Sequence, residues 1–558
     1  MKLLFFYIKK HKLLLFIALI MAAINICFSL SDSVITGKLM QDCGVGIAKY
    51  KGREADFIKA VGFWLMLSLG AAMVSRLTKN FQDYFTNIVI QRTGAEMYTD
   101  GIKKSLDLPY EDFEDQRSGE TLSRLQKVRT DSEKLITLSI SLVFQTIVGF
   151  TFVIIYISQI DYRIALIFLV SAPIIAVLSS FLGKRIKVIS RRIVTQTNSL
   201  AGSNTESLRN IELVKSLGLT EQEEGRLNSN TQKILSLELQ KIRFIRSLSF
   251  IQGTTVHFLR TCVVFALYYF LFGDKILVGD LLTMVFFTFF IFGPLQELSQ
   301  FIIVKNETKV SMENFAALLD AKSEFRPANP KHIGIISSLH FANVTFKHKS
   351  AMYPAVENIN FDIKQGETVA FVGPSGSGKT TFMRVLCGLL EPTSGSFFIN
   401  DDTYRKIDLD QYRSQIGTIL SGETPFEGTI LENITFKNPN ITQEQIKWAI
   451  ESVKLGNLIK SLPKGLDTKI FPEGRQLSSS DAQKILLARC IISKPKVLFF
   501  EEALDKMDTK IAQEIIDFLT DKENKWTLIV ASKNKYWKEK CTRTITMQEG
   551  KIINDSKK

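Results

Sequence analysis

Residues 373–380 read Gly373-Pro374-Ser375-Gly376-Ser377-Gly378-Lys379-Thr380 and follow the apolar run Thr368-Val369-Ala370-Phe371-Val372. A short buried strand, a glycine-rich turn and a helix that opens near the lysine are the context of a P-loop. The backbone N–H groups of such a loop and of the helix N-terminus point into one concavity that suits a polyphosphate. We therefore expect a nucleotide to bind here. The alternative is a glycine-rich loop that matches the pattern by chance.

The residue types in this loop predict distinct roles. Lys379 is expected to reach the β- and γ-phosphates of ATP, and the Thr380 hydroxyl is expected to hold Mg²⁺. ATP and Mg²⁺ are thus the predicted cofactors. The loop residues predicted to bind the nucleotide are Gly373, Ser375, Gly376, Gly378, Lys379, Thr380 and Thr381.

Long apolar runs are confined to the first 305 of the 558 residues. They form segments at about 13–32, 57–77, 135–158, 164–183, 253–272 and 280–303. Each approaches the ~20 residues that cross a hydrocarbon core as a helix. The sequence therefore predicts a multi-pass membrane protein with six spans in a lipid bilayer.

The net charge of +14 has a membrane explanation. Cations lie beside the apolar segments, at Lys9–Lys12, and crowd the polar stretches 78–134 and 184–246. This is the positive-inside bias, which predicts that the amino terminus and the carboxyl-terminal half are cytoplasmic. The expected membrane is the plasma membrane. Nucleic acid is not an expected partner. The six cysteines show no metal-ligand spacing, so we expect free thiols.

A composition shift divides the chain. After Ala321 the sequence is rich in Pro, Ser and Gly up to Ser338, and from about residue 340 short apolar runs alternate with amphipathic segments. The predicted domains are a transmembrane domain at 1–320, a linker at 321–338 and an ATP-binding domain at 339–558. The predicted fold class is an all-α six-helix transmembrane domain followed by an α/β P-loop ATPase domain.

Further motifs appear in a recognisable order. Residues 495–502, Pro495-Lys496-Val497-Leu498-Phe499-Phe500-Glu501-Glu502, end an apolar run in two acids, and residues 477–481 read Leu477-Ser478-Ser479-Ser480-Asp481. The membrane half contains Leu108-Pro109, Phe113, Gly119 and Ser123-Arg124, then Asn210-Ile211 and Val214-Lys215. Together with six spans and a P-loop, this order resembles an ABC transporter half of the exporter type, with fused membrane and ATPase domains. The resemblance covers nearly the whole chain.

The resemblance implies roles for three more residues. Glu501 matches the position where the family has an aspartate that positions Mg²⁺, and Glu502 matches the glutamate that polarises the attacking water. Glu502 is therefore the expected catalytic base. His348 stands where the family has an aromatic residue that stacks on adenine, although an ordinary loop histidine is equally compatible with the sequence.

Three departures from the family pattern predict restrained hydrolysis. The family's LSGGQ signature, which grips the γ-phosphate bound to the opposite subunit, is replaced by residues 477–481, where Ser478 is kept and Asp481 adds a negative charge at a helix start. The family's Q-loop glutamine falls on Ser421, and its switch histidine falls on Lys533. These departures resemble the degenerate half of a dimer. The expected partner is a second ABC half-transporter, with a heterodimer favoured and a homodimer possible.

The fifth span contains ionisable residues that can face a cargo cavity. His257 and Arg260 share a helix face, and Arg260 lies roughly 10 Å inside the hydrocarbon boundary at ~1.5 Å per residue. Such a residue normally faces the bundle interior or a wet cavity, although snorkelling to the headgroups is the alternative. Trp64, Asn25 and Gln145 can line the same cavity.

Two function classes follow from these patterns. The first is a subunit of an ATP-driven exporter that moves an amphipathic or hydrophobic molecule, with hydrolysis that is slow or depends on the partner. The second is a non-pumping, ATP-binding membrane regulator with little or no hydrolysis. Lys379, Thr380 and Glu502 favour the first class, whereas Ser421, Asp481 and Lys533 favour the second.

Overall fold

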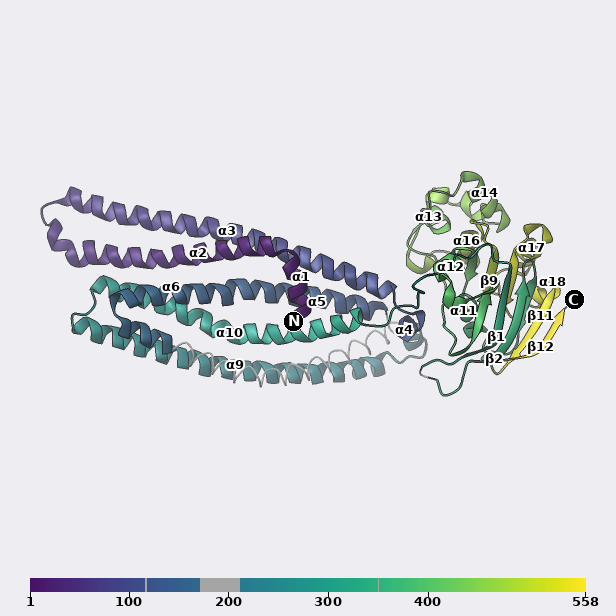
Figure 1. The fold of residues 1–558 in the computed structure, drawn as a ribbon, viewed down its shortest axis with the longest axis horizontal. Coiled ribbons are helices and arrows are strands. Elements are labelled where there is room, and N and C mark those ends of the chain that lie inside the picture. The colour runs from purple at the N-terminus through teal and green to yellow at the C-terminus, as the bar shows by residue number, and fades with distance from the viewer. Residues whose placement is uncertain (116–117, 171–210, 350, 558) are drawn as a thin grey trace. The chain divides into compact units, whose positions relative to one another are not determined.

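A computed structural model describes residues 1–115, 118–170, 211–349 and 351–557 of the protein. Its internal contacts define two compact units, Met1–Leu106 with Ser118–Ala321, and Asp107–Arg117 with Lys322–Lys558. The first unit is helical, and the second combines sheets and helices (Figure 1). The predicted fold class is confirmed.

Long and short helices build the described part of the first unit. They are α1 (Lys2–Lys10), α2 (Lys12–Leu39), η1 (Met40–Gly44), η2 (Val45–Tyr50), α3 (Glu54–Leu106), α5 (Ser118–Leu138), η3 (Ser139–Phe144), α6 (Gln145–Ile160), α8 (Ile211–Ser216), α9 (Thr220–Phe272) and α10 (Val278–Leu319). Among the described residues, four segments are long and apolar enough to cross a membrane: Lys12–Tyr50, Glu54–Leu106, Thr121–Ile160 and Thr220–Phe272. Val278–Pro294 is a shorter apolar helix. Most of the predicted span 164–183, and Asn210, lie outside the described residues.

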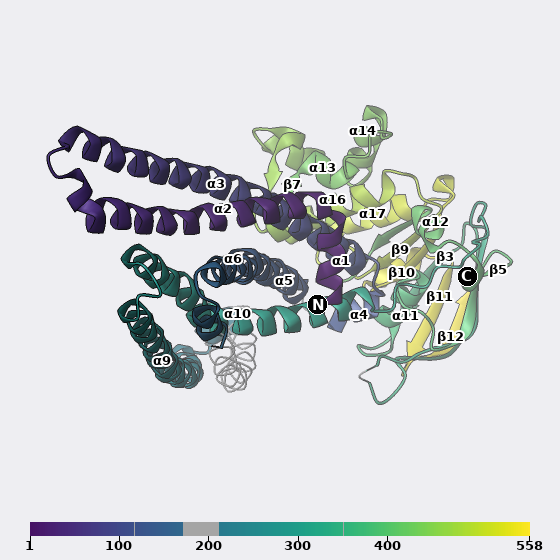
Figure 2. The same cartoon turned by 60° about the vertical axis from the view of Figure 1, so that its left-hand side comes forward.

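The helices pack closely along the unit. α2 and α3 run side by side, as both ribbon views show (Figures 1 and 2). α2 also meets α10, where an added Cβ on Gly37 or Gly279 would collide with the other glycine's carbonyl oxygen, and the Gly279 N–H donates to Gln41 Oε1 at 3.0 Å. Small residues permit this close backbone approach.

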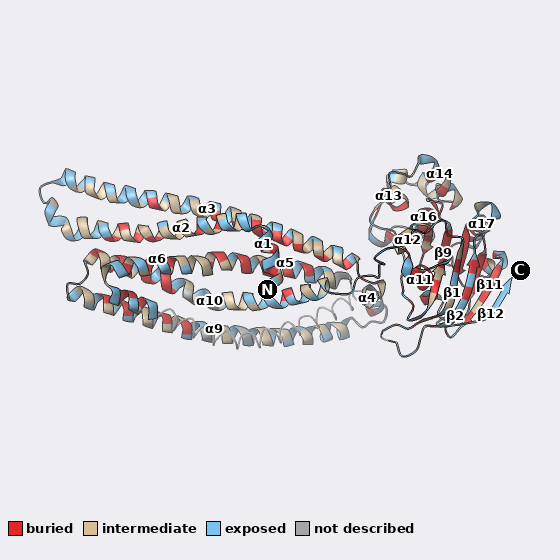
Figure 3. Cartoon of the chain, in the orientation of Figure 1, coloured by how far each residue is buried: buried red, intermediate tan, exposed pale blue. Residues whose placement is uncertain are grey.

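The outer faces of the helices are exposed (Figure 3), and many of the side chains exposed there are large and apolar. Phe63, Met66, Phe258 and Phe265 each expose more than half of their surface. In a soluble domain such a surface would be unfavourable, whereas lipid replaces water around a membrane span. The burial pattern of the first unit therefore fits a bilayer-spanning bundle.

The second unit contains three sheets and their covering helices. Its strands are β1 (Ser338–Phe346), β2 (Val356–Lys364), β3 (Thr368–Val372), β4 (Ser394–Ile399), β5 (Asp402–Thr403), β6 (Ile416–Ile419), β7 (Gly428–Thr429), β8 (Lys469–Ile470), β9 (Val497–Glu501), β10 (Thr527–Ala531), β11 (Arg543–Gln548) and β12 (Lys551–Lys557). Its α-helices are α4 (Tyr110–Asp115), α11 (Lys379–Leu386), α12 (Leu409–Ser414), α13 (Ile430–Thr435), α14 (Gln443–Ser452), α15 (Gly456–Ser461), α16 (Ser479–Ile491), α17 (Thr509–Thr520) and α18 (Lys535–Lys540).

The largest sheet positions the P-loop. Its order is β12-β11-β3-β10-β9-β6, and all neighbours pair in parallel except the edge strand β12. Every residue of β9 and β10 is buried, because helices cover both faces of a parallel sheet and select continuous apolar runs. Figure 3 shows this buried sheet centre. Since the strands are parallel, the carboxyl ends of β3, β10 and β9 meet at one edge.

Candidate nucleotide-binding site

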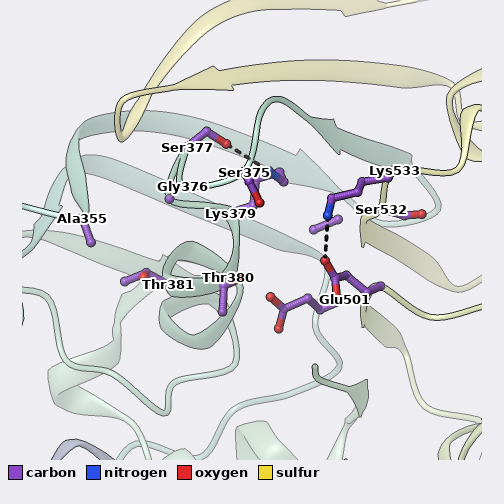
Figure 4. Close-up of a pocket in the computed structure, with 13 residues that line it drawn as sticks. Ala355, Ser375, Gly376, Ser377, Lys379, Thr380, Thr381, Glu501, Ser532 and Lys533 are labelled. Carbon is purple, nitrogen blue, oxygen red and sulfur yellow. Dashed lines mark hydrogen bonds and ion pairs between the residues drawn. The ribbon is translucent and has the colours of Figure 1, made fainter. Parts of the chain in front are cut away.

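A cavity of about 200 Å³ opens at the carboxyl ends of β3, β9 and β10 (Figure 4). Residues 375–381, Glu501, Glu502 and 531–533 line it together with Ala355. The crevice beyond the carboxyl ends of parallel strands is the usual ligand site of open α/β sheets. The structure thus brings the predicted loop and both predicted acids around one space.

Two glycines of the loop combine a positive φ, which other residues rarely adopt, with a close contact to another backbone segment. Gly373 has φ +151° and lies against the Met547 carbonyl, and Gly378 has φ +91° and lies against the Ala355 carbonyl. A Cβ at either position would collide with that carbonyl oxygen. Gly378 is also the N-cap of α11, so its conformation sets the direction in which the helix N-terminus points.

Gly378→Ala is expected to lower the affinity for ATP by tenfold or more, because the added Cβ must displace the backbone at Ala355. Gly376→Ala is the matched control. Gly376 also has a left-handed φ, +79°, but an added Cβ there meets no atom within 4 Å. Equilibrium binding of ATP to both purified variants checks the prediction. Equal losses in the two variants would refute the role assigned to the collision.

Lys379 already lies over the loop concavity. Its Nζ donates to Gly373 O at 3.0 Å, Pro374 O at 2.8 Å and Ser377 Oγ at 3.0 Å. Burial, and next the positive charge of Lys533, lower the pKa of Lys379, although Glu502 and Glu501 oppose this shift. The ammonium is thus partly desolvated where a phosphate would neutralise it.

Glu501 occupies the predicted metal position at the end of β9. Its side chain is buried, and one carboxylate oxygen accepts a hydrogen bond from the Ser421 N–H at 3.1 Å. The extra methylene of glutamate therefore reaches the backbone of the segment that, in the family pattern, carries a glutamine. The serine side chain plays no part in this bond.

The residues present fit Mg²⁺ as a minimal site. Thr380 and Glu501 line the same cavity, and Mg²⁺ commonly uses one or two carboxylates while phosphates and waters complete its shell. The Thr380 hydroxyl and the second Glu501 oxygen are the groups that would hold the ion. The ion would supply charge neutralisation at the β- and γ-phosphates.

Glu502, the predicted base, is not free in the cavity. Its backbone φ is +49°, an uncommon value for a residue with a Cβ, and its N–H donates to Ala531 O at 2.8 Å. Its carboxylate forms an ion pair with Lys533, with Nζ and Oε1 3.7 Å apart. The residue at the family's histidine position therefore contacts the residue at the catalytic position.

The predicted signature segment forms the start of α16. Ser478 is the N-cap, and its Oγ accepts the Asp481 N–H at 3.0 Å while donating to Asp481 Oδ2 at 2.7 Å. The Lys484 ammonium, which is buried, lies 3.4 Å from Asp481 Oδ1. An internal carboxylate thus occupies the helix N-terminus that would otherwise attract an anion.

His348 lies at the start of the loop after β1. Its ring packs edge-on against the buried Phe346 with centroids 4.9 Å apart, and it is half-buried. The next residue, Lys349, bonds Asp112 Oδ1 and lies 3.6 Å from Glu111 Oε2 on α4, which raises the Lys349 pKa. The adenine contact predicted for His348 stays a prediction.

Comparison with known sequences identifies the family. A sequence model described as "ABC transporter transmembrane region" matches residues 15–295, which is half of the chain, and one described as "ABC transporter" matches residues 356–505. The chain belongs to the ABC transporter family. In this family the ATPase domain binds ATP, generally with Mg²⁺, and drives transport, and its exporters work as dimers.

Similar proteins and a solved structure agree on the exporter type. The chain is 25% identical to the "ATP-dependent lipid A-core flippase" of Vibrio cholerae over 560 residues, which covers 98% of this chain and 93% of the relative. It is 25% identical to the "ATP-dependent permease MDL1" of Candida albicans over 511 residues, covering 88% and 71%. A "bacterial Atm1-family ABC exporter with ATP bound" has the same fold, with a TM-score of 0.85, 19% identity and coverage of 97% and 95%. The predicted family is confirmed.

In the membrane half of this ABC transporter, the predicted cavity residues lie in different surroundings. The Arg260 guanidinium on α9 stacks over the Phe289 ring of α10 at 4.6 Å, which ties the arginine to a neighbouring helix. His257 is exposed on α9. The Trp64 indole N–H lies 3.4 Å from Asp42 Oδ2. The cargo role of His257 and Arg260 stays a prediction.

Two groups of contacts were absent from the sequence-based prediction. Gln145 Nε2 donates to Gln82 Oε1 at 2.9 Å and to Asn25 Oδ1 at 3.3 Å, which links α6, α3 and α2. The link from Lys349 to α4 is the other, and an Arg384–Tyr110 cation–π contact at 5.5 Å accompanies it. Asn25 and Gln145 are polar residues within apolar segments. This pattern is the signal from which the contacts between these amide side chains could have been predicted.

Proposed function

We propose that the chain is one half of a dimeric ATP-driven exporter that moves an amphipathic or hydrophobic molecule across the plasma membrane, with its ATPase domain in the cytoplasm. One observation carries this proposal. Residues 375–381 of the phosphate cradle and the acid Glu502 line one cavity, where Lys533 forms an ion pair with Glu502. Asp481 lies at the start of α16. We propose that Lys533 and Asp481 restrain turnover. Hydrolysis is therefore slow or dependent on the partner.

The dimer partner follows from the altered signature. If two P-loop sites form between two subunits, the partner's nucleotide meets Ser478–Asp481 of this chain. Asp481 is held there by Ser478 and Lys484, so it opposes a γ-phosphate approaching the start of α16. We propose a heterodimer in which a second half-transporter supplies the other signature; a homodimer is the alternative.

The proposed cargo is amphipathic because the enclosed space in the bundle has mixed walls. A cavity of about 80 Å³ between α2, α6 and α10 is lined by apolar side chains such as Leu30, Val153 and Phe290, and by the uncharged polar residue Gln145. Arg260 lies on α9 against Phe289, where it would favour an anionic group on the cargo. We propose that His257 and Arg260 contact that group.

Asp481→Asn is expected to raise the hydrolysis rate of the assembled dimer about threefold to tenfold, because it removes a negative charge from the phosphate-facing helix start while keeping the side-chain size. Asp408→Asn, at the N-cap of α12, is the matched control, and it should leave the rate unchanged. Steady-state ATPase assays in lipid provide the measurement. A rate in Asp481→Asn equal to that in the control would contradict the proposed obstruction.

The proposed function itself is tested by ATP-dependent transport in sealed vesicles that contain the purified chain with its partner. Export predicts that a fluorescent amphipathic probe accumulates on the side opposite the ATPase domain only when ATP is supplied. The regulator hypothesis, which Ser421, Asp481 and Lys533 favour, predicts ATP binding without any probe movement.

A further inference from the structure

Four charged side chains meet in the nucleotide cavity. Lys379 and Lys533 supply two cations, and Glu501 and Glu502 supply two anions. Lys379 donates to its own loop, and Glu501 accepts from Ser421, so these two charges already have fixed partners. The other two side chains, Lys533 and Glu502, form an ion pair with each other at 3.7 Å.

The backbones that carry this pair are held in place. β9 and β10 pair in parallel, and their last residues, Glu501 and Ala531, lie opposite each other. The segments that follow the two strands therefore start side by side. The Lys533 N–H donates to Asp505 Oδ2 at 3.3 Å, and the Ser532 hydroxyl donates to Asp505 as well. Glu502 is fixed by its bond to the Ala531 carbonyl. The attachment points are thus held in place, whereas the lysine side chain is long and exposed.

The ion pair itself is easily exchanged. The Lys533 side chain is 66% exposed and that of Glu502 is 48% exposed, and an ion pair so open to water is weak. A γ-phosphate brings more negative charge than one carboxylate, and an ammonium can donate up to three hydrogen bonds to it. Figure 4 shows Lys533 extending into the cavity towards the P-loop side.

We propose that Lys533 is an exchangeable counter-charge, which pairs with Glu502 in the empty site and moves to the γ-phosphate when ATP binds. The proposal rests on the proposed function, since it assigns a specificity role within that site. Lys533 then distinguishes ATP from ADP, because ADP lacks the group that draws the lysine away from Glu502. Lys533 acts as a positioning and specificity residue, and no covalent step involves it.

The exchange makes a specific energetic prediction. In the unmodified chain, ATP must break the Lys533–Glu502 pair before it gains the lysine. Replacing Glu502 by glutamine removes that competition and also removes a repulsive charge. In a chain that lacks the lysine, the same replacement removes only the repulsion. The two substitutions should therefore be non-additive in ATP binding, which a double-mutant cycle detects.

The experiment measures equilibrium binding of AMP-PNP and ADP, each with Mg²⁺, to four forms of the full chain in lipid: unmodified, Lys533→Met, Glu502→Gln and the double variant. Lys535→Met, which replaces an exposed lysine at the start of α18, is the matched control. We expect Lys533→Met to weaken AMP-PNP about tenfold and ADP less than twofold. We also expect Glu502→Gln to strengthen AMP-PNP at least threefold more when Lys533 is present.

Equal weakening of both nucleotides by Lys533→Met, or additive effects of the two substitutions, would overturn the proposal. Because AMP-PNP is not hydrolysed, these readouts do not depend on turnover or export. Failure of the exporter function would instead appear as normal nucleotide binding without ATP-dependent transport. A chain that binds neither nucleotide would refute both.

Discussion

Lys379→Ala is expected to lower the affinity for ATP by about 100-fold or more. Lys379 Nζ lies within 3.0 Å of three oxygen atoms of its own loop, so the ammonium already stands in the concavity where the phosphates would bind. Each charge-assisted hydrogen bond contributes about 1.5–3 kcal/mol, and the β- and γ-phosphates would accept at least two. Calorimetric titration of the purified chain with ATP provides the measurement.

The control for this prediction is another lysine of the same unit. Lys447 is exposed on α14 and does not line the nucleotide cavity, so Lys447→Ala should bind ATP as the unmodified chain does. An affinity of Lys379→Ala within about threefold of the control would mean that the nucleotide does not use this loop.

Glu502→Gln is expected to reduce the slow hydrolysis of ATP on this chain's own P-loop by about 10²–10⁴-fold, while ATP binding is kept or improved. The amide has nearly the same shape as the carboxylate, but it cannot accept the proton of the attacking water. Glu502 lines the cavity just after β9. Glu501 is the other acid there, but its carboxylate is buried and hydrogen-bonded to the Ser421 N–H, so we do not expect it to replace Glu502 as the base. Phosphate release over time gives the rate.

The matched control is Glu514→Gln on α17, whose carboxylate forms an exposed pair with Lys454. This variant should hydrolyse ATP at the unmodified rate, since Glu514 does not line the cavity. Persistent hydrolysis in Glu502→Gln would show that the catalytic base is elsewhere, and the exporter proposal would lose its catalytic argument.

Local patterns predicted much of the site. The P-loop, the two acids at the end of β9 and the start of α16 are each encoded within a few consecutive residues, and the structure places the loop and the acids around one cavity. The Asp481–Ser478 contact is also local, because residues three apart at a helix start face each other. Such features follow from spacing alone.

Contacts between distant segments were not predictable in the same way. The Lys533–Glu502 pair depends on β10 lying beside β9, which no pattern within either strand reveals. The Arg260–Phe289 contact depends on how α9 and α10 pack, and a helical wheel of α9 alone left snorkelling open. The sequence therefore identified Lys533, Glu502 and Arg260 as candidate residues, but it did not predict which side chains they contact.

Contacts between distant segments also explain why α4 belongs to the second unit. The sequence placed 107–117 within the first 320 residues, whereas these residues group with the second unit. The Lys349–Asp112 pair and the Arg384–Tyr110 contact hold α4 there. The position of a residue along the sequence does not reveal that a short segment packs with a unit formed mainly by residues more than 200 positions later.

The central claim is that ATP on the P-loop of this chain is retained and hydrolysed slowly. The most direct measurement photolabels the working transporter with 8-azido-ATP carrying radioactive phosphorus at either the α- or the γ-position, and then separates the subunits. The account predicts that both labels stay on this chain, because the nucleotide bound there keeps its γ-phosphate. Retention of the α-label with loss of the γ-label during steady turnover would contradict it.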